Sequence, residues 1–215
     1  MGDLGVDTAV ERVGEGAYTA TLNDEWAIWG PMGGYLASVA LRAAGAESPF
    51  ARPASFFCQY LGVADFAEVE LTVTALRTAR TALAQRVEVT QDDRRILEAT
   101  VWSIGDVDGL AHDETAAPDV PHHRDLKSIL EHLTEEELAQ GPGFPFWNNL
   151  DTKPIEFTRT PSPDPRPPIF RDWQRFVPTA TFDDPWVDAC RSLVLIDVQS
   201  WPAACRPHPY DSRGF

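Results

Sequence analysis

The sequence predicts an α+β fold in which an antiparallel β-sheet wraps around one long helix. Three observations from the first half of the chain lead to this fold class. Two adjacent glycines, Gly33 and Gly34, open an apolar stretch at residues 36–46 that has the length of a helix. A strand-like run precedes this stretch. Runs that alternate apolar and polar residues follow it, as in strands with one face on a core and one face in water.

The elements are expected in the order strand, helix and four strands. The first strand covers residues 17–22. The helix then presents Leu36, Val39, Ala40 and Ala43 along one face, which is expected to pack on the sheet. The remaining strands are expected at residues 55–61, 68–76, 81–90 and 95–104. The last two form a hairpin that turns at Asp92-Asp93.

The glycines at the start of the helix admit two interpretations. Backbone N–H groups at a helix N-terminus, where partial positive charge gathers, suit an anion, a phosphate or a thioester carbonyl that acquires negative charge. A Gly-Gly pair before a helix is also typical of a tight turn or a close packing contact.

Residues 16–106 resemble the first half of the TesB-type acyl-CoA thioesterases. The matching pieces are Gly33-Gly34 with its small-residue helix, the aromatic strand at residues 56–61, and residues 76–87, which resemble the family's Arg-containing turn between two strands. The resemblance implies a hotdog fold, the sheet wrapped around a helix. It also implies an enzyme of fatty acid metabolism that hydrolyses acyl-CoA thioesters to free acid and CoA with no cofactor.

The length of 215 residues exceeds one hotdog unit. The second half weakly repeats the element order of the first, with pairing strands at residues 156–159 and 169–176 and a helix opened by Asp184-Pro185 and ended at Trp201-Pro202. TesB-type proteins are similar, since they fuse two hotdog units in one chain.

We therefore expect a tandem, double hotdog arrangement with a linker between the units. The N-terminal unit is assigned to residues 10–106, the linker to residues 107–146 and a partial C-terminal unit to residues 147–215. A short amphipathic helix is expected within the linker at residues 123–139. The second unit is expected to lack its last three strands, so that the activity of this polypeptide alone is in question.

Asp197 is the residue expected to carry the chemistry. It lies in an otherwise apolar segment, residues 193–202, where a carboxylate is costly unless it is paired or used. The resemblance matches it to the family's aspartate, which activates the attacking water together with a Thr-type hydroxyl and a Gln from later strands. A partly buried Asp197 would be the general base, and the N–H of Gly34 or a neighbour such as Gly33 would stabilise the oxyanion. The alternative is an aspartate that caps the turn after its helix.

Two polar residues on the aromatic strand, Ser55 and Gln59, are candidates to line the substrate site. Side chains of a strand alternate between faces, so both residues also fit a purely structural role. Arginines on two neighbouring strands are candidates for binding CoA, or form a solvated face that balances nearby carboxylates. They are Arg77, Arg80, Arg86, Arg94 and Arg95.

Composition and motifs argue against several other classes of partner and reaction. A net charge of −15 argues against nucleic acid. The sequence contains no Gly-x-Ser-x-Gly nucleophile elbow, its five histidines lie outside the predicted sheets, and its three cysteines lack metal spacing. No apolar run approaches a membrane span. We expect a cytoplasmic protein with reduced thiols and no metal site, and by analogy a homo-oligomer.

Two functions from different classes remain open at this stage. The first is an acyl-CoA thioesterase-like hydrolase that uses water activated by Asp197. The second is a non-catalytic hotdog protein that binds an acyl group or an assembly partner through the second helix.

Overall fold

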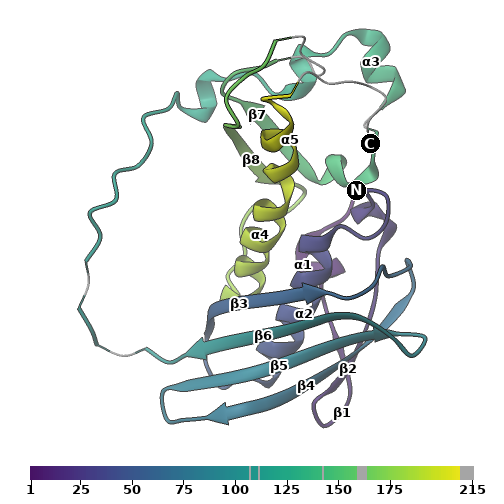
Figure 1. Ribbon diagram of the computed structural model, residues 1–215, viewed down its shortest axis with the longest axis vertical. Helices are drawn as coiled ribbons and strands as arrows, with labels where there is room; N and C mark the ends of the chain where they lie inside the picture. Colours follow the sequence, from purple (N-terminus) through teal and green to yellow (C-terminus); the bar gives the residue numbers. More distant parts are fainter. Residues whose placement is uncertain (107, 111, 142, 159–163, 209–215) are drawn as a thin grey trace.

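A six-stranded antiparallel sheet forms the largest element of the computed structural model, which describes all residues except 107, 111, 142, 159–163 and 209–215. The strand order is β1-β2-β4-β5-β6-β3, so β3 lies at one edge beside β6 (Figure 1). The strands are β1 (Glu11–Gly14), β2 (Ala17–Thr21), β3 (Arg52–Tyr60), β4 (Glu68–Thr78), β5 (Ala82–Gln91) and β6 (Arg94–Ile104). The five strands expected within residues 17–104 are all present; β1 and the short helix α1 (Leu4–Asp7) were not expected.

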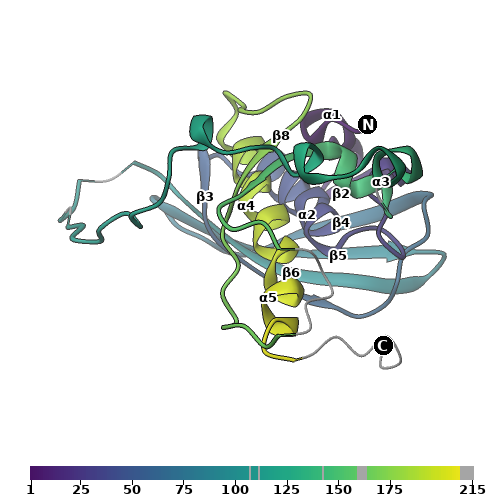
Figure 2. The same ribbon diagram turned by 90° about the horizontal axis from the view of Figure 1, so that it is seen from above.

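The expected central helix is α2 (Gly33–Glu47), which packs on the inner face of the sheet. The face predicted from its apolar spacing is buried, and so are most of its other residues. The reason is a second helix, α4 (Pro185–Val198), which packs along the side of α2 that the sheet leaves free (Figure 2). A helix that is apolar almost all round is stable only when both sides are covered.

The strands show the alternation on which their prediction rested. On β4, Val69, Leu71 and Val73 are buried while their neighbours are exposed. The β5–β6 hairpin turns at Asp92 and Asp93, with φ angles of 49° and 61°, as a two-residue turn between twisted strands requires.

Trp26 connects the N-terminal part of the core to the segments after residue 140. It belongs to the short 3-10 helix η1 (Asp24–Trp26), is fully buried and stacks on Tyr35 with ring centroids 5.2 Å apart. The rings of Phe146, from η4 (Pro145–Asn149), and of Phe176 pack against the Trp26 indole, with ring centroids 6.1 Å and 6.5 Å away. The indole N–H donates to Asp7 at 2.9 Å. Aromatic rings from both halves of the chain thus share one cluster.

The amphipathic helix expected at residues 123–139 is wrong as a single helix. Three short pieces replace it: η2 (His123–Asp125), η3 (Ile129–His132) and α3 (Glu135–Gln140). Capping boxes at Ser128 and Thr134 begin new turns, and Leu126 and Leu133 between the pieces are extended. Cap side chains compete with a continuous helix for the backbone N–H groups.

The connector before these pieces has no regular structure. Residues 112–119 are exposed and belong to no helix or strand. Figure 1 shows this connector bowing away from the rest of the chain.

The second sheet is a hairpin of two strands, with a pairing different from the predicted one. β7 (Leu150–Pro154) pairs with β8 (Asp172–Phe176), whereas residues 156–158 form no strand and residue 159 lies outside the described residues. Leu150, Thr152 and Pro154 are buried and alternate with Asp151 and Lys153. This alternation gives residues 150–154 an inner face.

The helix α4 begins as predicted, with the Asp184 carboxylate accepting from the Trp186 N–H at 2.9 Å and Pro185 in the first turn. Its predicted end at Trp201-Pro202 is wrong. α4 ends at Val198, and Trp201 and Pro202 lie inside the next helix, α5 (Ser200–Cys205). Pro202 is tolerated because the N–H groups of a first helical turn have no intrahelical partner.

Candidate active site

The N-terminus of α2 receives a carboxylate from α4. Met32 precedes the helix and provides no side-chain cap, and the Gly34 N–H donates to Asp197 Oδ2 at 2.9 Å across 163 residues of sequence. The partial positive charge at a helix N-terminus stabilises a carboxylate in this position. The structure thus brings together two of the predicted site residues, Gly34 and Asp197.

Close packing of α2 against α4 sets this contact. A Cβ atom at Gly34 would lie 2.5 Å from the Leu193 carbonyl oxygen and 2.7 Å from the Val194 Cα. One turn further on, the Ser38 hydroxyl lies 2.7 Å from the Gly34 carbonyl and 3.3 Å from that of Cys190. Gly34 is therefore a close packing contact, the second of the two interpretations, and its N–H binds a carboxylate of the chain itself.

Asp197 is exposed, not partly buried as predicted. Trp186, Cys190, Val194 and Val198 recur at four-residue intervals and form the buried face of α4. Asp197 lies beside this face and Ile196 is 79 % exposed, so the apolar composition of the segment does not bury its carboxylate. One carboxylate oxygen is bound to the Gly34 N–H, and the side chain remains accessible to water and substrate.

Two side chains of β3 join Asp197, and the sequence analysis missed both. A Cβ atom at Gly33 would lie 2.9 Å from Asp197 Oδ2 and 3.0 Å from the Tyr60 hydroxyl oxygen. The Cys58 thiol lies two residues before Tyr60 on the same face of β3, close enough for each group to influence the pKa of the other. Gly33 thus lies beneath a cluster made of a carboxylate, a phenol and a thiol.

Burial keeps both of these β3 groups protonated. Although Tyr60 is 52 % exposed as a residue, its hydroxyl end lies against Gly33, and burial together with Cys58 and Asp197 raises the pKa of Tyr60 well above its ordinary value. Burial likewise raises the pKa of Cys58, with Asp197 adding to the effect. At neutral pH the cluster offers a phenol O–H donor and no thiolate.

Ser55 and Gln59 lie on the other face of β3, away from this cluster. Both are exposed, and they pair with Trp102 and Glu98 of β6 on the outer face of the sheet. Cys58 and Tyr60 instead pair with the buried Ala99 and Leu97. The structure therefore does not bring Ser55 or Gln59 together with Asp197.

Exposed apolar side chains flank the cluster on each of its three segments. Trp29 precedes α2 and is 85 % exposed, Leu61 follows Tyr60 and is 49 % exposed, and Ile196 precedes Asp197. Trp29 lies edge-on to Phe144 with ring centroids 5.8 Å apart. These residues expose apolar surface on the three segments that carry the cluster.

Three of the arginines considered for CoA contact carboxylates. Arg86 and Arg95 lie 3.3 Å and 3.8 Å from Glu88, and Arg94 lies 3.0 Å from Asp65. These contacts favour the solvated-face interpretation for these three side chains. Among the described residues, no group of three or more His, Cys, Asp or Glu side chains is placed to hold a metal ion.

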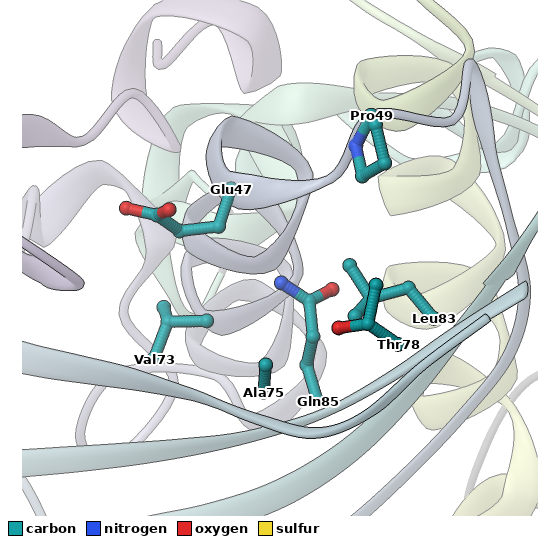
Figure 3. Close-up of a pocket in the computed structure, with 7 residues that line it drawn as sticks. All are labelled: Glu47, Pro49, Val73, Ala75, Thr78, Leu83 and Gln85. Carbon is teal, nitrogen blue, oxygen red and sulfur yellow. The ribbon is translucent and has the colours of Figure 1, made fainter. Parts of the chain in front are cut away.

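A separate hollow of about 180 Å³ lies at the opposite end of α2. Figure 3 shows Gln85 of β5 extending toward Glu47 and Pro49, with Val73 and Ala75 on one side and Thr78 and Leu83 on the other. The Gln85 amide donates to the Ala44 carbonyl at 3.2 Å, and its oxygen has no hydrogen-bond partner among the described residues. The hollow's carboxylate, Glu47, is occupied by Tyr18 and Arg12, so this hollow is a poorer site for hydrolysis than Asp197.

Glu47 makes stability depend on pH. Its pKa lies below the ordinary value of 4.5, chiefly because the Tyr18 hydroxyl and then Arg12 stabilise the carboxylate. The contribution of the Glu47 carboxylate to the free energy of unfolding is fully present above its unfolded-state pKa. This contribution is lost as the pH falls through the lower folded-state pKa. We expect Glu47→Gln to flatten the decline in thermal midpoint between about pH 5 and pH 3. Glu136→Gln, at an exposed site on α3, should leave that decline unchanged.

The sheet and helix define the fold as a hotdog, and three solved structures share it. A protein of unknown function with a hot dog fold from Alicyclobacillus acidocaldarius is 20% identical, with a TM-score of 0.70 over 92% of this chain and 72% of its own. The acyl-CoA thioesterase II TesB2 from Mycobacterium marinum is 16% identical, with a TM-score of 0.71 over 96% and 72%. The tesB protein from Mycobacterium avium subs. paratuberculosis is 21% identical, with a TM-score of 0.70 over 95% and 72%.

Residues 22–104 match the family model of the acyl-CoA thioesterase N-terminal domain. This match supports the resemblance of residues 16–106 to the TesB-type acyl-CoA thioesterases, and the solved structures confirm the predicted hotdog fold. No curated protein sequence matches the chain. None of the helices in the described ranges is both long enough and apolar enough to span a bilayer.

Proposed function

We propose that this chain hydrolyses acyl-CoA thioesters with water activated by Asp197. The observation that carries the proposal is the hydrogen bond from the Gly34 N–H to Asp197 Oδ2, in a chain whose residues 22–104 match the acyl-CoA thioesterase N-terminal domain. The bond fixes one carboxylate oxygen at the N-terminus of α2. The other oxygen, Oδ1, is then the proton acceptor for a water molecule.

The reaction requires one water and no cofactor. Asp197 takes a proton as the water oxygen attacks the thioester carbonyl carbon. The tetrahedral intermediate collapses, the C–S bond breaks, and the CoA sulfur leaves with the proton that Asp197 returns. The exposed apolar side chains of Trp29, Leu61 and Ile196 supply surface for the acyl chain.

The test is hydrolysis of short-, medium- and long-chain acyl-CoA by the purified chain, followed as released thiol. We expect turnover in the wild type and a loss of about 10²-fold or more in Asp197→Asn, because an amide oxygen still accepts from the Gly34 N–H but is a poor base. Asp188→Asn is the matched control, since Asp188 lies on the same helix and pairs with Arg191 at 2.6 Å. It should retain wild-type turnover.

Absence of turnover from the folded wild type at every chain length would contradict the enzyme proposal. A non-catalytic hotdog protein that binds an acyl group or an assembly partner would then be the better description. Assembly into a homo-oligomer and a cytoplasmic location remain predictions from the sequence, and light scattering on the same sample measures the first.

A further inference from the structure

The Gly34 N–H is a weak candidate for the oxyanion donor that the sequence assigned to it. Its proton is engaged by Asp197 Oδ2 at 2.9 Å. A backbone N–H has one proton, so donating it to a thioester oxygen would release the carboxylate that it positions. If Asp197 is the base, another donor is needed where negative charge develops.

The Tyr60 hydroxyl lies in the right place for this. The point occupied by a Cβ at Gly33 is 2.9 Å from the Asp197 carboxylate and 3.0 Å from the Tyr60 hydroxyl oxygen. Gly33 has no side chain, so both groups can lie against the backbone at the start of α2, close to one another. A thioester carbonyl that accepts from the Tyr60 hydroxyl would therefore lie beside the carboxylate of the proposed base, and a base next to a hydrogen-bond donor is the arrangement expected of a hydrolytic site.

The chemistry of the three groups assigns their roles. Burial raises the pKa of Tyr60, so the phenol keeps its proton at neutral pH and can donate it in a hydrogen bond. The pKa of Cys58 is raised as well, which disfavours the thiolate that a cysteine nucleophile requires. The cluster therefore fits attack by water better than an acyl-cysteine intermediate.

We propose that Tyr60 is a catalytic residue whose hydroxyl donates a hydrogen bond to the thioester carbonyl oxygen over Gly33. This inference rests on the proposed thioesterase function. Water attacks the carbonyl carbon and gives its proton to Asp197, while Tyr60 stabilises the oxyanion without losing its own proton. When the C–S bond breaks, the carbonyl re-forms and the thiol leaves with the proton from Asp197.

The test compares Tyr60→Phe with the wild type in the acyl-CoA assay. Phenylalanine keeps the ring and removes only the hydroxyl, so the thermal midpoint should change little while kcat falls by about 10²-fold with KM nearly constant. Tyr18→Phe is the matched control, since it removes a hydroxyl at the far end of α2, where Tyr18 bonds Glu47 at 2.7 Å. It should retain wild-type kcat.

A second variant separates the role of the Tyr60 hydroxyl from that of the neighbouring Cys58 thiol. Cys58→Ala removes the thiol that Tyr60 contacts and should keep kcat within about threefold of the wild type. Equal losses in Cys58→Ala and Tyr60→Phe would overturn the proposal, as would full activity of Tyr60→Phe when Asp197→Asn is inactive. Lack of activity in the wild type would instead overturn the thioesterase function, and this inference with it.

Discussion

Replacing Gly34 with alanine is expected to lower the free energy of unfolding by about 3 kcal/mol. The added methyl group would lie 2.5 Å from the Leu193 carbonyl oxygen and 2.7 Å from the Val194 Cα. Both atoms belong to the backbone of α4, so no side-chain rotation relieves the overlap and the two helices must separate. Urea denaturation followed by circular dichroism measures the change.

Gly33→Ala is the matched control for this variant. Its methyl group would meet the ends of two side chains, those of Asp197 and Tyr60, which can rotate away. The free energy of unfolding of Gly33→Ala should therefore stay within about 1 kcal/mol of the wild-type value. Hydrolysis should fall, because the methyl group displaces the Asp197 carboxylate and the Tyr60 hydroxyl. Equal stability of Gly34→Ala and wild type would contradict the close approach of α2 and α4.

Trp26→Ala is expected to cost about 4 kcal/mol of unfolding free energy. The indole is fully buried, stacks on Tyr35 and contacts Phe146 and Phe176, so its loss leaves a large cavity among aromatic rings. The partly buried hydrogen bond to Asp7 is lost as well. Thermal and urea unfolding should both move to lower midpoints.

Trp29→Ala provides the comparison within the same segment. Trp29 is 85 % exposed, so removing its indole should change the free energy of unfolding by less than about 0.5 kcal/mol. Similar losses in the two variants would contradict the assignment of Trp26 to the shared core. Because Trp26 joins segments from both halves, its removal should also weaken the N-terminal sheet and α4 together, in a single transition.

The helix and strands of residues 17–104 could be predicted because their local pattern and their tertiary role agree. The alternation of apolar and polar residues along β4 predicts which face of the strand is buried, and Asp92-Asp93 predicts the turn of the β5–β6 hairpin. The later segments were predicted less well because local hydrogen bonds compete there with apolar periodicity. The caps at Ser128 and Thr134 divide an apolar pattern that reads as one helix.

The candidate site could be predicted only in part. Gly34 and Asp197 carry signals in the sequence, a glycine pair before a helix and a carboxylate among apolar residues. Tyr60 and Cys58 carry none alone, because their role depends on which face of β3 meets α2. The alternation of Phe56, Cys58 and Tyr60 on one face was the available signal, and it would have directed attention away from Ser55 and Gln59.

The exposed connector at residues 112–119 has a consequence for how the chain holds together. A protease that cuts there would separate the segment bearing Gly34 and Tyr60 from the segment bearing Asp197. The α2–α4 contact and the rings around Trp26 would still hold the two fragments, now as partners of a noncovalent complex. The contact between Asp197 and the N-terminus of α2 would then join two separate chains. In the intact protein, the connector mainly raises the effective concentration of one segment at the other.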